Sequence, residues 1–148
     1  MPQSYRQRKS PRLQGYDYSQ CGAYFVTICT YERQHVFGKI IDAEMMLSDA
    51  GKVAVSRWHA IPDHYPDVDL DAFVVMPNHV HGILVLTGAS EFKTVLGRVI
   101  NAYKGAVTAQ IRKQQRTAMK VWQSRYHDHI IRNTSSLRHI RKYVINNP

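Results

Sequence analysis

The chain has 148 residues, 44% of them hydrophobic, which favours one globular domain with a packed core. Its formal net charge of +9 favours a polyanionic partner such as nucleic acid, although a merely basic protein would carry the same charge. Two cysteines, no long apolar span and no leader-like N-terminus argue against a disulfide framework, membrane insertion and secretion, so we expect a cytoplasmic protein.

Residues 1–20 are polar and basic, and we expect them to form a mobile arm that either tethers nucleic acid or has no role. A single domain is expected over residues 21–148. Its first segment, GAYFVTICTYE at 22–32, is rich in β-branched and aromatic residues and predicts a buried strand. FGKI at 37–40 predicts a short edge strand.

A first helix is predicted next, because apolar residues recur at roughly helical spacing, namely Met46, Val53, Val55, Trp58 and Ile61. Pro62 and Pro66 mark its end. Two further strands are predicted at 69–77 and 79–88. They are close enough in sequence to form an antiparallel pair joined by a tight turn.

The stretch 91–114 carries an apolar stripe with cations on its remaining face, and it predicts the longest helix. A last strand is predicted at 122–132, and Thr134 or Ser135 is expected to cap a last helix at 135–147. This order is the split βαβ plan of α+β, ferredoxin-like domains. It predicts an antiparallel sheet with two helices on one face and an opposite face partly closed by the C-terminal helix.

The segment MPNHVHG at 76–82 places two histidines one residue apart in a predicted strand. Because side chains alternate along a strand, His79 and His81 point to one face and Val80 to the other. Their Cβ atoms are expected about 6.5–7 Å apart, so both imidazoles can bind one metal ion. A pair of surface histidines is the alternative, and the spacing alone does not decide between them.

The last predicted helix carries a second set of polar side chains. His139, Tyr143 and Asn147 follow one another at four-residue intervals and therefore stack along one side of the helix. The buried stripe of the helix is expected to consist of Leu137, Ile140 and Val144. Tyr143 and Asn147 then lie where the helix meets the sheet, although a tyrosine there can also be a half-buried packing residue.

The sequence blocks, taken in order, resemble a known family. RLQGYDYSQCGAYFVTICT, FGKI, DAFVVMPNHVHGI, VWQSRYHDHIIRN and RKYVINNP are similar to blocks of the IS200-like, single-tyrosine transposases of the HUH class, most closely the REP-associated tyrosine transposases. The resemblance covers nearly the whole chain. It implies metal-dependent nicking and strand transfer of single-stranded DNA through a 5′-phosphotyrosine intermediate, in bacterial cytoplasm and at the nucleoid when bound to DNA.

The resemblance also implies roles for individual residues. His79 and His81 correspond to metal ligands, Tyr143 to the nucleophile, and Asn147 to a third ligand. The implied metal is Mg²⁺ or Mn²⁺, although two imidazoles alone favour softer ions such as Zn²⁺. The sequence ends at Pro148, directly after Asn147, so we expect the last helical turn to fray and to hold Asn147 loosely.

Single-stranded or hairpin DNA is the expected partner, bound by a monomer or a homodimer. Residues that could line its groove, or could equally be solvated, are Lys104, Arg125, His129, Arg132, Arg141 and Lys142. One alternative function is a non-catalytic module that binds hairpin DNA or RNA on the same fold. Another is a metallohydrolase that uses the histidine pair and an activated water. The presence of the complete residue set favours the transposase, because neither alternative needs Tyr143.

Overall fold

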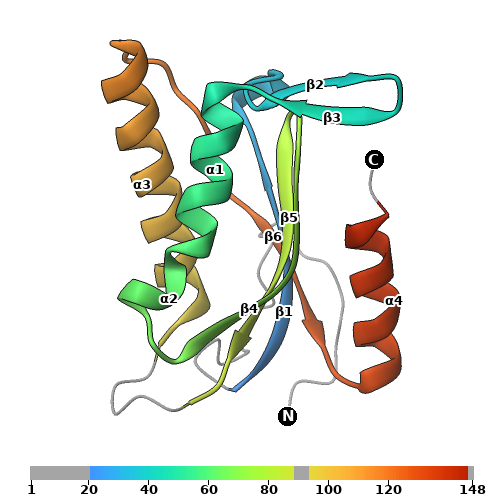
Figure 1. Ribbon diagram of the computed structural model, residues 1–148. Helices are drawn as coiled ribbons and strands as arrows, with labels where there is room; N and C mark the ends of the chain where they lie inside the picture. The colour runs from blue at the N-terminus through green and yellow to red at the C-terminus, as the bar shows by residue number, and fades with distance from the viewer. Residues whose placement is uncertain (1–20, 89–93, 147–148) are drawn as a thin grey trace.

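The computed structural model describes residues 21–88 and 94–146, and its centre is a four-stranded antiparallel sheet (Figure 1). The strand order is β4-β5-β1-β6. The strands are β1 (Gly22–Cys29), β4 (Val68–Met76), β5 (His79–Leu86) and β6 (His127–Ile131). The two central strands are therefore β5 and β1, which carry most of the buried sheet.

Helices lie on both faces of this sheet. One face is covered by α1 (Asp49–His59) and α3 (Leu96–Gln115), with the short α2 (Ile61–His64) following α1 (Figure 1). The opposite face carries α4 (Thr134–Ile145), which contacts β4 and β5. The predicted α+β, ferredoxin-like architecture with an extra C-terminal helix is confirmed.

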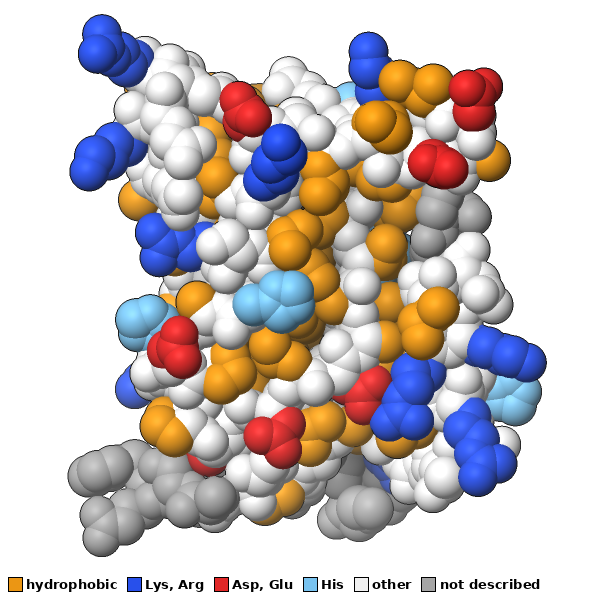
Figure 2. All heavy atoms as spheres, in the orientation of Figure 1, with side chains coloured by type: hydrophobic (Ala, Val, Ile, Leu, Met, Phe, Trp, Pro, Cys, Tyr) orange, Lys and Arg blue, Asp and Glu red, His pale blue; other side chains and the backbone are white. Residues whose placement is uncertain are grey.

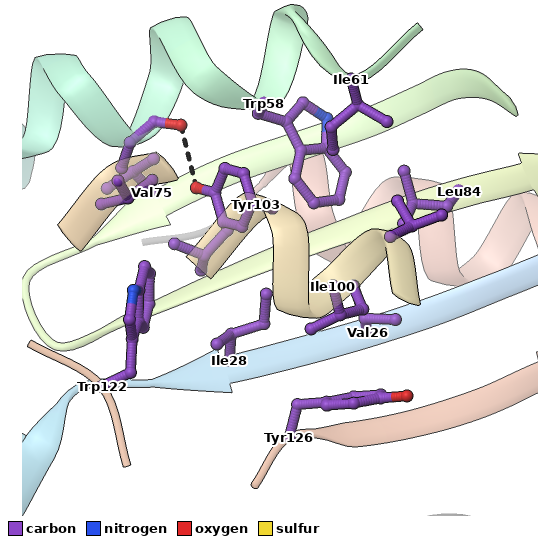
Figure 3. Close-up of a cluster of buried hydrophobic side chains, with 14 of the residues drawn as sticks. Val26, Ile28, Trp58, Ile61, Val75, Leu84, Ile100, Tyr103, Trp122 and Tyr126 are labelled. Carbon is purple, nitrogen blue, oxygen red and sulfur yellow. Dashed lines mark hydrogen bonds between the residues drawn. The ribbon is translucent and has the colours of Figure 1, made fainter. Parts of the chain in front are cut away.

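The main core lies between the sheet and the α1–α3 layer (Figure 3). Alternate residues of β1 point into it, and Tyr24, Val26 and Ile28 are fully buried. Gly82 on β5 allows α1 to approach, because a Cβ there would lie 2.4 Å from the ring of Trp58. This core fixes β5, so every second residue of that strand is directed to the α4 face.

The chain between β1 and α1 contains the strand predicted at 37–40, but otherwise differs from the prediction. A one-turn 3₁₀ helix, η1 (Tyr31–Arg33), follows β1, and β2 (Gly38–Ile41) then pairs with β3 (Glu44–Leu47) in a separate hairpin. Met46 therefore lies in a strand, and assigning it to the first helix was wrong. Asp42 and Ala43 both have positive φ, the turn geometry that closes a two-residue hairpin.

The first helix begins only at Asp49 because Ser48 caps it. The Ser48 hydroxyl accepts a hydrogen bond from the Gly51 amide at 3.0 Å and donates one to the Val36 carbonyl at 2.8 Å. The cap thus ties the start of α1 to the segment before β2.

The C-terminal elements are shorter than predicted. β6 begins at His127, and Trp122 instead forms an isolated bridge with Thr30. α3 begins at Leu96, and the start of its predicted range, residues 91–93, lies outside the described residues. The cap of α4 is Asn133, whose side-chain oxygen accepts from the Ser136 amide at 2.7 Å, so the predicted caps Thr134 and Ser135 were wrong.

The predicted arm at 1–20 and the predicted third ligand Asn147 also lie outside the described residues. Among residues 21–88 and 94–146, no helix is long and apolar enough to cross a membrane.

Candidate active site

His79 and His81 lie on the α4 face of β5. In the pairing with β1, His79 is opposite Cys29 and His81 is opposite Thr27. Val80 points to the other face and is fully buried, as the alternation of a strand requires. The two imidazole ring centroids are 4.4 Å apart, so the rings form one cluster.

Each imidazole is oriented by a hydrogen bond at Nδ1. His79 Nδ1 lies 2.8 Å from Asn78 Oδ1, and His81 Nδ1 lies 2.9 Å from Thr27 Oγ1. Asn78 Oδ1 can only accept, so this contact requires the His79 proton on Nδ1, and the Thr27 hydroxyl can accept in the same tautomer. The Nε2 lone pairs then remain for a ligand, the arrangement typical of metal-binding histidines.

Burial keeps this pair neutral. His81 is 8% exposed, and burial, followed by the proximity of His79, lowers its pKa to about 4. Burial and then the charge of Arg33 lower the pKa of His79 as well. Neutral imidazole is the form that binds metals, so both side chains are ready to act as ligands at neutral pH.

Tyr143 on α4 lies beside the histidine pair. Its ring centroid is 5.6 Å from that of His81 and 6.3 Å from that of Phe25. Phe25 stacks on the His81 ring at 5.4 Å and so lies against both predicted site residues. The Tyr143 side chain is 56% exposed, whereas the adjacent Val144 is fully buried and attaches the helix to the sheet. The phenol is therefore both near the imidazoles and open to a substrate.

The predicted DNA-contacting residues do not all lie near Tyr143. Lys and Arg side chains gather over α4, where Lys142 is exposed next to the tyrosine (Figure 2). His129, on β6, is opposite Phe25 and shares the face of the histidine pair. Arg125 precedes β6 and Arg132 follows it.

Lys104 and Arg141 each bind another group of the protein. Lys104 lies on α3, across the sheet from α4, and its ammonium donates to the Gln123 carbonyl at 2.9 Å. Arg141 lies on α4 and forms an ion pair with Asp71 of β4. The structure therefore does not bring Lys104 together with Tyr143, and it commits Arg141 to a carboxylate.

The sequence reasoning missed four residues around the site. Thr27, Asn78 and Phe25 hold the imidazoles, and Asp71 holds the helix that carries Tyr143. Asn78 directly precedes the first histidine, and this adjacency was the one local signal. The other three are brought in by strand pairing or helix docking, which sequence spacing does not reveal.

The donor set fits a divalent cation only in part. Within the described residues, no group of three His, Cys, Asp or Glu side chains could hold a metal ion. The two Nε2 atoms could supply two ligands, and the remaining positions would need an amide such as that of Asn147, a substrate oxygen or water. Such a site is open on the side that faces a substrate, which suits catalysis better than structural binding.

Comparisons with known proteins identify the family of the chain. The sequence model of one family, described as "Transposase IS200 like", matches residues 17–147. An uncharacterized protein of Haemophilus influenzae is 35% identical over 95% of this chain and 88% of its own length.

Two solved structures share the fold. The structure of a REP-associated tyrosine transposase bound to a REP hairpin has a TM-score of 0.67 at 21% identity, over 90% of this chain and 69% of that one. A crystal structure of a candidate transposase from Deinococcus radiodurans has a TM-score of 0.50 at 22% identity, over 91% and 97%.

Proposed function

The chain belongs to the IS200-like transposase family, and we propose that it nicks and rejoins single-stranded DNA through a covalent bond to Tyr143. The observation that carries this proposal is the 5.6 Å separation between the rings of Tyr143 and His81, which come from a helix and a strand far apart in the sequence. A phenol in this position, exposed beside a pair of metal-type histidines, suits phosphoryl transfer.

In the proposed reaction Tyr143 attacks the scissile phosphorus. The phenol loses its proton, its oxygen bonds to phosphorus, and the bond from phosphorus to the 3′ oxygen breaks, so that this oxygen takes up a proton. The products are a 5′-phosphotyrosine and a free 3′-hydroxyl. Because the phosphodiester is conserved as an ester of Tyr143, a 3′-hydroxyl can later displace the tyrosine and rejoin the strand without ATP.

His79 and His81 are the proposed metal ligands, with Asn147 as a third ligand and Mg²⁺ or Mn²⁺ as the metal. When bound, such a cation would neutralise charge on the phosphate and polarise its phosphorus. The contribution of the protein is to hold both imidazoles by Nδ1, through Asn78 and Thr27, and to keep them neutral by burial. Holding Tyr143 beside them removes much of the entropic cost of bringing the reactants together.

The proposed substrate is a single strand that carries a DNA hairpin, which is also what one solved fold relative binds. An unpaired backbone can pass over the α4 face to Tyr143, where Lys142 and His129 could contact it. Because Tyr143 lies beside the His81 of its own chain, one copy supplies both, so we propose a monomer as the minimal active unit. A bacterial cytoplasmic location, at the nucleoid when DNA is bound, follows from this substrate.

The test is covalent capture of DNA. The wild-type chain is incubated with a radiolabelled single-stranded hairpin and Mn²⁺, and adducts are separated on a denaturing gel. We expect an adduct with the wild type and none with Tyr143→Phe or His79→Ala. Tyr65→Phe and His64→Ala, which change the same residue types on the far side of the sheet, should keep the adduct.

Two other outcomes would replace the proposal. Hairpin binding by the wild type without any adduct would favour the non-catalytic nucleic-acid module. Strand cleavage that survives Tyr143→Phe but is lost in His79→Ala would favour a metallohydrolase.

A further inference from the structure

An ion pair joins the helix that carries Tyr143 to the edge strand of the sheet. Arg141 Nε lies 2.8 Å from Asp71 Oδ1, and Arg141 Nη2 lies 2.7 Å from Asp71 Oδ2. Two parallel contacts between a guanidinium and a carboxylate fix orientation as well as distance. This pair therefore constrains how α4 is turned and where it sits along β4.

Asp71 lies at a β-bulge in β4. The pairing with β5 shifts between Leu70 and Phe73, so Asp71 and Ala72 together face one residue of the partner strand. The carboxylate also accepts the Ala72 amide at 2.7 Å, which holds it in place from its own strand. The β-bulge thus presents a fixed carboxylate to the α4 face.

The rest of the attachment of α4 is slight. Val144 is the only buried residue of α4 within its described range, Thr134–Ile145, whereas Leu137 and Ile140, which were expected to be buried with it, are only half-buried. One fully buried and two half-buried aliphatic side chains resist separation from the sheet, but they are non-directional contacts and set the rotation of the helix less sharply than a hydrogen-bonded ion pair does. Arg141 lies within one helical turn of Tyr143, so any such movement is transmitted to the phenol.

We propose that Asp71 and Arg141 form a positioning pair that sets the place of Tyr143 relative to His81, and that Arg141 acts through Asp71 and not through DNA. The inference rests on the proposed function and adds to it two residues that do not touch the reacting atoms. It assigns Arg141 a role other than the DNA contact expected from the sequence. The two roles differ in their effects, because the loss of a phosphate contact weakens DNA binding, whereas a displaced nucleophile slows the reaction of bound DNA.

The decisive variant is Asp71→Asn, because a carboxylate is not a phosphate ligand and its removal takes away no DNA contact. Asp69→Asn is the matched control. Asp69 is exposed on the same strand two residues earlier, and its substitution changes the net charge of the protein by the same amount. Adduct formation is followed in single turnovers at saturating hairpin DNA, and the Kd is measured separately. We expect the rate to fall roughly 10- to 100-fold in Asp71→Asn, with a Kd equal to that of Asp69→Asn.

Amide hydrogen exchange supplies a readout that does not depend on activity. In Asp71→Asn, exchange should be faster in α4 than in Asp69→Asn, while α3, which packs in the main core, should keep its protection. Exchange that rises equally in α3 and α4 would mean general destabilisation and would overturn the proposal. An unchanged adduct rate in Asp71→Asn would overturn it as well.

A charge exchange provides rescue. Arg141→Asp alone should be slow, and the double variant Asp71→Arg with Arg141→Asp should recover part of the rate. Lack of any recovery, with α3 protection intact, would count against a pairwise role.

The failure of the proposed function can be told apart from the failure of this inference. If wild type forms no adduct, the proposed function is wrong, and hydrogen exchange still decides whether the pair positions α4. Faster exchange confined to α4 in Asp71→Asn would support the pair, and no difference from Asp69→Asn would overturn it.

Discussion

The pH dependence of stability offers a direct test of how His81 is held. Burial, followed by the proximity of His79, lowers the pKa of His81 to about 4, whereas an unfolded histidine titrates near its usual 6.5. As the pH falls from 6.5 towards 4, the unfolded chain takes up a proton that the folded chain refuses. His81 therefore lowers the free energy of unfolding across this window, and the full stability returns above pH 6.5.

The magnitude follows from the two pKa values. The linkage relation gives a loss of about 2 kcal/mol at pH 5, rising to about 3 kcal/mol at pH 4, relative to neutral pH. This is a large fraction of the 5–15 kcal/mol typical of domain stability. Unfolding free energies extrapolated from denaturant carry their own uncertainty, so this loss is best measured as a difference between two variants under identical conditions.

The assay is urea unfolding at pH 7 and pH 5 in the presence of EDTA. Wild type is compared with His81→Asn, in which every other titrating group is the same and cancels in the difference. Wild type should lose about 2 kcal/mol more than His81→Asn between the two pH values. Equal losses in wild type and His81→Asn would refute the claim that burial keeps this imidazole neutral.

Three further substitutions test the packing of the fold and one contact of the site. Gly82→Ala should destabilise the fold by about 1–3 kcal/mol, because the new methyl group would meet the ring of Trp58, and urea unfolding measures the loss. Gly105→Ala, at an exposed helical position with nothing within 4 Å of an added Cβ, should instead stabilise by about 0.5–1 kcal/mol, and a loss there would contradict the packing described. Thr27→Val keeps the side-chain shape but removes the hydroxyl beside His81 Nδ1. The affinity for Mn²⁺, measured by calorimetry, should fall about 10-fold. An unchanged affinity would show that this hydrogen bond does not orient the His81 imidazole.

Local periodicity predicted most of the sheet and its helices correctly. The β-branched and aromatic content of 22–32 identified β1, and the apolar stripe of 91–114 identified α3. The strand predicted at 37–40 corresponds to β2, but its partner β3 was missed because Met46 and Leu47 are exposed and give neither a clear alternation nor a helical stripe. The helix start at Ser48 is a local cap, because the Ser48 hydroxyl accepts from the Gly51 amide, and the sequence prediction missed it by including Met46 in the helix.

The site was predictable to the extent that its chemistry is local. The spacing of His79 and His81 gave the shared face, and the helical spacing of the last segment placed Tyr143 at the border of the buried stripe. The contact between Asp71 and Arg141 was not predictable, because it joins residues 70 positions apart and depends on an irregularity in β4. The sequence likewise gave no sign that Lys104 lies across the sheet from the tyrosine.

The irregular step in β4 has a consequence for comparing sequences of this kind. Leu70 and Phe73 pair with Leu84 and Gly82, residues that face the same side of the sheet, although an odd spacing would normally direct them to opposite sides. A homologue lacking one residue here would return to regular alternation, with Leu70 and the phenylalanine stacked on Trp58 still on the core side and a single residue between them on the α4 face. Gaps of a single position at 71–72 in an alignment should therefore leave the core residues of β4 aligned, and the arginine on the last helix should be lost only where the single remaining residue is not acidic.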